Sequence, residues 1–229
     1  MLPRRHLLAI LCAASAPSAA AVAQMPPTAA ETAAYTGLHA AAARNDAAEV
    51  ARLLAAKTDP EARDAAGRTA AHVAAFAAAP DALRALAKGG ADLRALENRR
   101  YDVVTIAAVR DDAAMVRLAL SLGGDARLIT SPYDGTALIA AAHLGHDEVV
   151  RALIEGGAPL DHVNNLGWTA LMEAVVLGDG GPRHVACARA LLAAGARRDI
   201  PDRDGVTPLE HAKRRGMREM VAAFEAAAR

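Results

Sequence analysis

The pattern of apolar and polar residues over 135–161 predicts two short helices joined by a tight turn. The first helix is Ala-rich, begins after Thr136, whose hydroxyl can cap it, and ends at Gly145. The second covers 147–155 and opens with two acidic residues, which stabilise a helix N-terminus. Its apolar residues recur at helical spacing and form one face: Val149, Val150, Leu153 and Ile154. One helical hairpin cannot bury this face alone, so the pattern predicts that further copies pack against it.

Five further stretches carry the same pattern and recur about every 33 residues. Thr occupies the capping position in four of them, and Asp102 occupies it in the remaining one. The fifth stretch carries an insertion around 178–182, between its two helices. This period predicts a single stack in which each repeat contacts its neighbours. The repeats are expected to cover about 35–63, 64–96, 97–130, 131–163, 164–201 and 202–229.

The first helices of these stretches resemble the T-P-L-H-x-A core of the ankyrin-repeat family. The matching segments are TGLHAA from Thr36, TAAHVA from Thr69, DVVTIA from Asp102, TALIAA from Thr136, TALMEA from Thr169 and TPLEHA from Thr207. The resemblance implies an all-α repeat fold (an α-solenoid), an ankyrin stack of about six helix-turn-helix repeats joined by finger loops. It also implies that His39 and His72, which match the family's histidine, brace the adjoining turns.

The N-terminal segment has the three parts of a secretory signal peptide. Arg4 and Arg5 form a basic start, an apolar run follows over 7–14, and Ala-Val-Ala over 21–23 forms the cleavage site. The apolar run is too short to span a membrane as a helix. We therefore expect a signal peptide over 1–23 and a periplasmic or secreted protein, exported by the Sec or the twin-arginine route.

The mature chain is expected to be a soluble monomer without a nucleic-acid partner or a membrane-inserted segment. Its first residues, 24–34, contain two adjacent prolines and no apolar period, which predicts a flexible leader. The whole chain balances 26 basic against 26 acidic residues, and loss of Arg4 and Arg5 leaves 24 − 26 = −2. This balance provides no bulk attraction to nucleic acid.

Cysteine usage excludes an intramolecular disulfide in the mature chain. Of the two cysteines, Cys12 leaves with the signal peptide, and Cys187 then has no partner. Cys187 lies in the apolar second helix of the fifth repeat, where we expect a small buried thiol. The alternative is a reactive thiol.

Few residues in the chain suggest chemistry, and we expect neither a cofactor nor a metal. His143 and His146 have the spacing of two ligands on one helix face, but Gly145 ends the helix between them. No nucleophile elbow or phosphate-binding glycine loop occurs, so an enzyme is not expected. The alternative function is a small-molecule binder or an enzyme that uses the insertion at 177–184 as a loop over the stack.

The ankyrin resemblance implies a non-catalytic protein-protein interaction module that binds through a concave face of fingers and first helices. In the bacterial periplasm such a module would bind, inhibit or stabilise a partner protein, for example in oxidative-stress defence or toxin immunity. Large aromatic residues and Arg supply most interface hot spots, although an aromatic or Arg side chain at a finger can instead pack against the neighbouring finger. The residues expected on this face are Tyr35, Arg44, Arg68, Phe76, Tyr101, Arg110, Tyr133, His143 and Trp168.

Overall fold

The computed structural model describes residues 24–227, and over this range the chain forms thirteen helices and no β-strand. The predicted signal peptide, 1–23, lies outside the described residues. After α1 (Ala29–Ala34), the helices form six antiparallel pairs. The pairs are α2 (Gly37–Ala43) with α3 (Ala47–Ala55), α4 (Ala70–Phe76) with α5 (Pro80–Lys88), α6 (Val103–Val109) with α7 (Ala113–Ser121), α8 (Ala137–Leu144) with α9 (Asp147–Glu155), α10 (Ala170–Val176) with α11 (Pro182–Ala193), and α12 (Pro208–Arg214) with α13 (Arg218–Ala226).

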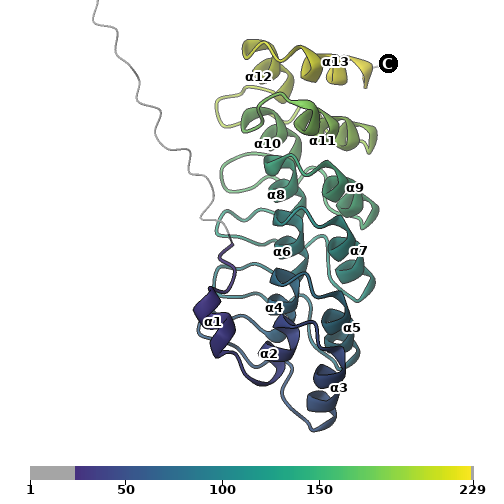
Figure 1. Ribbon diagram of the computed structural model, residues 1–229. Helices are drawn as coiled ribbons and strands as arrows, with labels where there is room; N and C mark the ends of the chain where they lie inside the picture. The colour runs from purple at the N-terminus through teal and green to yellow at the C-terminus, as the bar shows by residue number, and fades with distance from the viewer. Residues whose placement is uncertain (1–23, 228–229) are drawn as a thin grey trace, which may run out of the picture.

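The six pairs stack in chain order into an elongated body (Figure 1). Each first helix packs against the first helix of the next pair, and the second helices form a parallel layer beside them. The loops that lead from each second helix to the next first helix project along one edge, at the left of Figure 1, and are called fingers below. The expected all-α ankyrin stack of six repeats is thereby confirmed.

Alanine at one repeated position allows the first helices to approach closely. The position lies five residues after the capping residue, and its side chain is fully buried in every repeat. A methyl group fills the space between two packed helices without forcing them apart. The residues at this position are Ala41, Ala74, Ala107, Ala141, Ala174 and Ala212, each with an exposed fraction of 0%.

The helix ends form as the polar residues around them predict. The hydroxyl of Thr136 accepts a hydrogen bond from the backbone N–H of Ile139 at 3.3 Å, which caps α8. Gly145 ends the same helix with a φ of 70°, a left-handed conformation that glycine adopts without a steric penalty. The carboxylate of Asp102 caps α6 by accepting from the N–H of Thr105 at 2.9 Å.

His39 and His72 brace adjoining fingers, as expected. The backbone N–H of Thr69 donates to Nδ1 of His72 at 3.1 Å, so Nε2 carries the proton. Nε2 lies 2.9 Å from the carbonyl oxygen of Ala95 and 3.2 Å from that of Tyr101, both in the next finger. His39 contacts the carbonyl oxygen of Arg68 at 2.9 Å in the same manner.

Asp102 differs from the capping threonines because its carboxyl group is fully buried and only one of its two oxygens has a hydrogen-bond partner. Oδ1 accepts from the backbone and the hydroxyl of Thr105, whereas Oδ2 has no hydrogen-bond partner. Burial raises the pKa of Asp102, against the weaker effect of the Thr105 hydrogen bonds. The folded state therefore holds the proton to a higher pH than the unfolded state, and stability is lost as pH rises between the two pKa values.

Replacement of Asp102 by Thr is expected to stabilise the fold by about 1–3 kcal/mol at pH 7, because it removes a buried carboxyl oxygen without a partner. The threonine hydroxyl retains the cap, as in the other repeats. Urea unfolding should show a smaller gain at pH 4, where the carboxyl group is closer to neutral. Asp112→Thr, at the half-buried cap of α7, is the matched control and should change stability by no more than about 0.5 kcal/mol. Equal effects of both substitutions would contradict the assignment.

The leader predicted over 24–34 to be flexible instead contains α1, and this prediction is wrong for its C-terminal half. Thr28 and Glu31 form a capping box, in which each side chain accepts a hydrogen bond from the backbone of the other. No residue of α1 is buried, so the helix is not held by an apolar face. Its anchor is the carboxylate of Glu31, which binds Arg68 in the first finger.

Candidate protein-binding face

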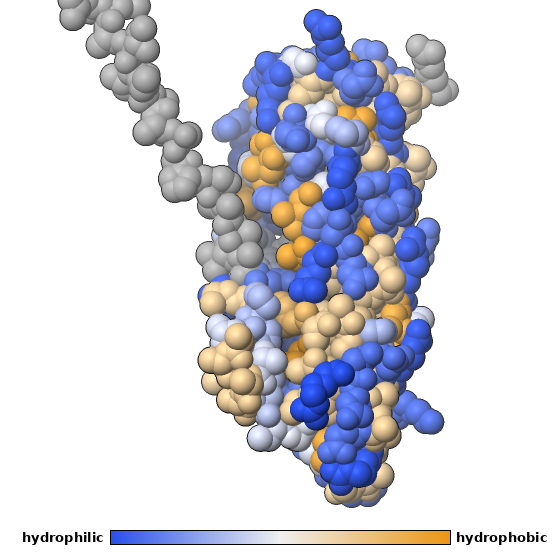
Figure 2. All heavy atoms as spheres, in the orientation of Figure 1, coloured by the Kyte–Doolittle hydropathy of each residue, from blue (hydrophilic) through white to orange (hydrophobic). Residues whose placement is uncertain are grey.

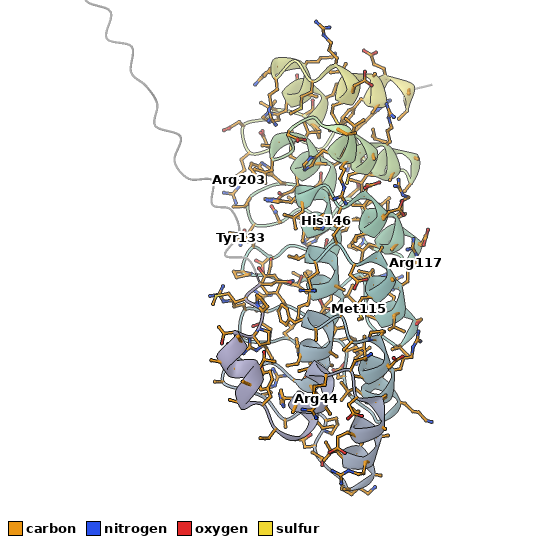
Figure 3. The ribbon with its side chains drawn as sticks, viewed as in Figure 1. Arg44, Met115, Arg117, Tyr133, His146 and Arg203 are labelled. Atoms are coloured by element: carbon orange, nitrogen blue, oxygen red, sulfur yellow. The ribbon has the colours of Figure 1, made fainter. Side chains whose placement is uncertain are left out.

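The first-helix ends bring four of the predicted site residues into one line. Arg44 and Arg110 are the exposed C-cap residues of α2 and α6. Phe76 ends α4 and is half-buried, and His143 lies at the equivalent position of α8, where its side chain is 30% exposed. Figure 3 shows Arg44 at the first helix of the lowest repeat. These four residues are therefore accessible on the same side of the stack.

The predicted site residues in the fingers differ from one another in how far they are exposed. Tyr35 is half-buried and donates its hydroxyl hydrogen bond to Asp64 at 2.7 Å, while burial and this hydrogen bond raise its pKa. Tyr133 and Trp168 are half-buried, and Figure 3 places Tyr133 among the fingers. Tyr101 is only 7% exposed, so its predicted role as a surface contact is wrong in this conformation. The reason is packing within the finger column, the alternative that the sequence left open for these aromatic residues.

Arg68 is also buried, with an exposed fraction of 3%, and its predicted place on the open face is likewise wrong. Its guanidinium binds Asp64 and Glu31, each at 2.6 Å, and donates to the carbonyl oxygen of Met25 at 3.4 Å. Burial opposes its charge, but the hydrogen bonds to Asp64 and Glu31 outweigh burial and raise its pKa. The leader thus covers this arginine, an arrangement that the sequence pattern does not reveal.

His143 belongs to a polar cluster between the fourth and fifth repeats. Its Nδ1 lies 2.9 Å from Oε2 of Glu173, a buried residue of α10. The other oxygen of Glu173 accepts from the side-chain amide of Asn164 at 2.9 Å. His146 does not face the same point, because its Nδ1 contacts the carbonyl oxygen of Ala108 at 2.9 Å. The two histidines are thus engaged separately, and no group of three or more potential metal ligands occurs within residues 24–227.

The insertion of the fifth repeat forms a short turn that packs into the stack. Gly178 is buried, and its carbonyl oxygen accepts from Arg215 of the next repeat at 3.0 Å. His184, in the first turn of α11, contacts the carbonyl oxygen of His143 at 3.0 Å and Asp179 at 2.9 Å. A shallow groove lies elsewhere, on the outer side between α9 and α11, away from this turn. The insertion therefore does not extend over the stack as a loop.

Cys187 is the buried thiol that the sequence predicts. It is fully buried in α11, and burial raises its pKa to about 12. A thiol with such a pKa is not ionised near neutral pH and is a poor nucleophile. Separately, no helix in the described part of the chain is long and apolar enough to cross a membrane.

Two exposed leucines also lie in the line of first-helix ends. The site prediction did not include them, because it selected mainly aromatic residues and arginines. Leu144 and Leu177 each follow the capping threonine of their repeat by eight residues and are 38% and 39% exposed. Figure 2 shows apolar patches in a row over the first helices, with hydrophilic side chains along the second helices at the right. Repeat register is the signal that identifies both leucines, because they occupy the same position of the repeat as Arg110.

The chain matches known repeat families over most of its described length. The family model of Ankyrin repeats (3 copies) matches residues 104–197, and that of Ankyrin repeats (many copies) matches 38–87. The ankyrin repeat protein YahD of Escherichia coli (strain K12) is 32% identical over 188 residues, which are 82% of this chain and 93% of YahD.

Solved structures show the same architecture. An ankyrin repeat domain from Acinetobacter baumannii AYE is 42% identical with a TM-score of 0.78, and the match covers 83% of this chain and 97% of that domain. A chain from the structure of the Bd0816 predatory endopeptidase of Bdellovibrio bacteriovorus in complex with immunity protein Bd3460 has a TM-score of 0.69 at 22% identity. That match covers 84% of this chain and 98% of the other, and it concerns the fold alone.

Proposed function

Because the chain belongs to the ankyrin-repeat family, whose repeats are generally protein-protein interaction modules, we propose that it is a non-catalytic protein that binds one partner protein. The binding face is the side formed by the first-helix ends and the fingers. The observation that carries this proposal is the line of exposed or half-buried side chains on successive repeats, from Arg44 to Leu177. Stacked repeats hold these side chains in a fixed geometry, which lowers the entropy lost on binding.

We place the protein in the bacterial periplasm, on the basis of the signal-peptide pattern of residues 1–23. There it would inhibit or stabilise an exported partner, in toxin immunity or in oxidative-stress defence. Intact-mass measurement of the exported protein is expected to show a chain that begins at Gln24, and a chain that retains Met1 would contradict the location.

Site-specific photo-crosslinking tests the binding face. A photoreactive phenylalanine analogue at Arg110 is expected to capture one discrete protein in the envelope of the producing bacterium. The matched control is the same analogue at Arg189, an exposed residue on the outer side of α11. Capture from Arg189 alone would place the partner on the outer helices, and no captured protein from either position would contradict the proposed function.

A further inference from the structure

The exposed apolar side chains of the stack are concentrated in its middle repeats. Within the described residues, the large apolar side chains that are exposed are Met25 of the leader and a set between 129 and 177. Single exposed apolar residues are common on protein surfaces, whereas a contiguous group indicates a contact site. The set comprises Ile129, Val163 and Leu166 in the fingers and Leu144 and Leu177 at the ends of first helices, and the latter two share one position of the repeat.

Leu144 and Leu177 occupy the same position on packed neighbouring helices, α8 and α10. The residues one position earlier add half-buried apolar surface to this line at Phe76, Val109 and Val176. Packed helix axes are about 8–10 Å apart, so the two leucines are separated by about the length of two helical turns. One partner helix with apolar residues seven positions apart can therefore contact both. We call Phe76, Val109, Arg110, Leu144, Val176 and Leu177 the first-helix strip.

The charges along the first-helix strip are unbalanced. Arg110 lies within it, and Arg44 and Arg214 lie beyond its two ends, all exposed and without a salt bridge to another described residue. Two carboxylates on or beside the first helices are already paired. Asp111 binds Arg183 at 2.8 Å, and Glu173 binds His143 at 2.9 Å. Glu49 and Glu210 lie within electrostatic range of Arg44 and Arg214, whereas Arg110 has no such partner among the described residues and is available to a ligand.

The leader already forms, within this chain, the kind of contact that an arginine on this face favours, an ion pair with a carboxylate on a helix. Glu31, which lies on a helix that buries none of its own residues, binds the guanidinium of Arg68 at 2.6 Å. In Figure 1, α1 lies beside the lower fingers, whereas α6, α8 and α10, which carry most of the strip residues, lie higher in the stack. Within residues 24–227, the leader covers Arg68 and leaves Arg110, Leu144 and Leu177 exposed.

We propose that the first-helix strip binds a segment of the partner protein that presents apolar side chains about 10 Å apart, flanked by Asp or Glu. This inference rests on the proposed function and specifies its ligand. The apolar side chains contact Leu144 and Leu177, and the flanking carboxylates bind Arg110 and Arg214. An arginine pairs strongly with a carboxylate because its planar fork can donate two hydrogen bonds.

The test uses a phage library of random 16-residue peptides selected on the protein that begins at Gln24. Peptides enriched in apolar residues flanked by Asp or Glu are expected. Their affinity should fall at least tenfold for the double variant Leu144→Ser and Leu177→Ser. Both leucines are partly exposed, and circular dichroism verifies that this variant remains folded. Peptides without acidic enrichment, or with equal affinity for the double variant, would overturn the proposal.

If the double variant does not fold, a charge reversal at Arg110 provides a second test of the proposal. The Arg110→Glu variant is expected to bind the acidic peptides at least fivefold more weakly than the wild-type protein does. It is also expected to bind versions of these peptides in which Lys replaces Asp or Glu. Arg189→Glu, on the outer side, is the matched control and should leave affinity unchanged. Loss of binding in the control, or no rescue by the Lys peptides, would contradict charge pairing at the strip.

The outcomes separate this inference from the proposed function. If Arg110 captures a discrete protein but the leucine variants retain full binding to it, the proposed function stands and the apolar-acidic ligand is wrong. If photo-crosslinking captures no protein, the proposed function itself fails, whatever peptides the library yields.

Discussion

Leu153→Ala is expected to lower the free energy of unfolding by about 2–5 kcal/mol. Leu153 is 0% exposed on α9, which packs between α7 and α11. Removal of its side chain leaves a cavity that the surrounding helices fill only in part, so both transfer energy and packing contacts are lost. In a stack, this loss also weakens the coupling of the fourth repeat to its neighbours.

Urea unfolding followed by circular dichroism measures this effect. Ile154→Ala provides the control on the same helix, because Ile154 is only half-buried and its truncation should cost less than that of Leu153. A loss below about 1 kcal/mol for Leu153→Ala would contradict its assignment to the packed interior. A deficit confined to the fourth repeat, seen by hydrogen exchange, would indicate that the stack does not unfold as one unit.

His72 is expected to make the fold sensitive to acid between pH 6.5 and about 4. Burial lowers the pKa of His72 from 6.5 to about 4, against the weaker effect of the Ala95 and Tyr101 carbonyl groups. Between these values the unfolded state binds more protons than the folded state, so stability falls as pH falls. Each pH unit contributes about 1.4 kcal/mol, which amounts to about 3 kcal/mol over the whole interval.

The measurement compares the wild-type protein with His72→Gln in urea unfolding at pH 7 and pH 4.5. Other titrating groups, including Asp102, contribute to both proteins, and the difference between the two pH dependences isolates the histidine. The variant should start less stable, because Gln cannot reproduce both contacts of the ring, and should lose less stability on acidification. Parallel pH dependences for the two proteins would show that His72 does not titrate across this interval.

On the candidate face, the sequence predicts the position of a residue in its repeat but does not predict whether its side chain is exposed. Repeat register placed Arg44, Phe76, Arg110 and His143 on one line, because a repeated backbone places equivalent positions side by side. The same register placed Tyr101 and Arg68 in the finger column, where both are buried. Register specifies the position of a backbone segment, whereas exposure depends on what else covers the side chain. For Arg68 the cover is the leader, 37 residues earlier in the chain at Glu31.

The sequence by itself determined the six repeats, the helix ends and the buried faces, because the periodicity of apolar residues and the capping residues are local properties. It also indicated the buried thiol of Cys187 and the bracing histidines. Tertiary structure alone decided three features: the docking of α1 on Arg68, the half-satisfied carboxyl group of Asp102, and the pairing of Asp111 with Arg183 across 72 residues. The first and third depend on contacts between residues that are distant in the chain, and the second depends on burial of the Asp102 carboxyl group within the stack. Hydrogen bonds and ion pairs of this kind leave no periodic pattern, because their free energy depends on burial and geometry that only the assembled stack provides.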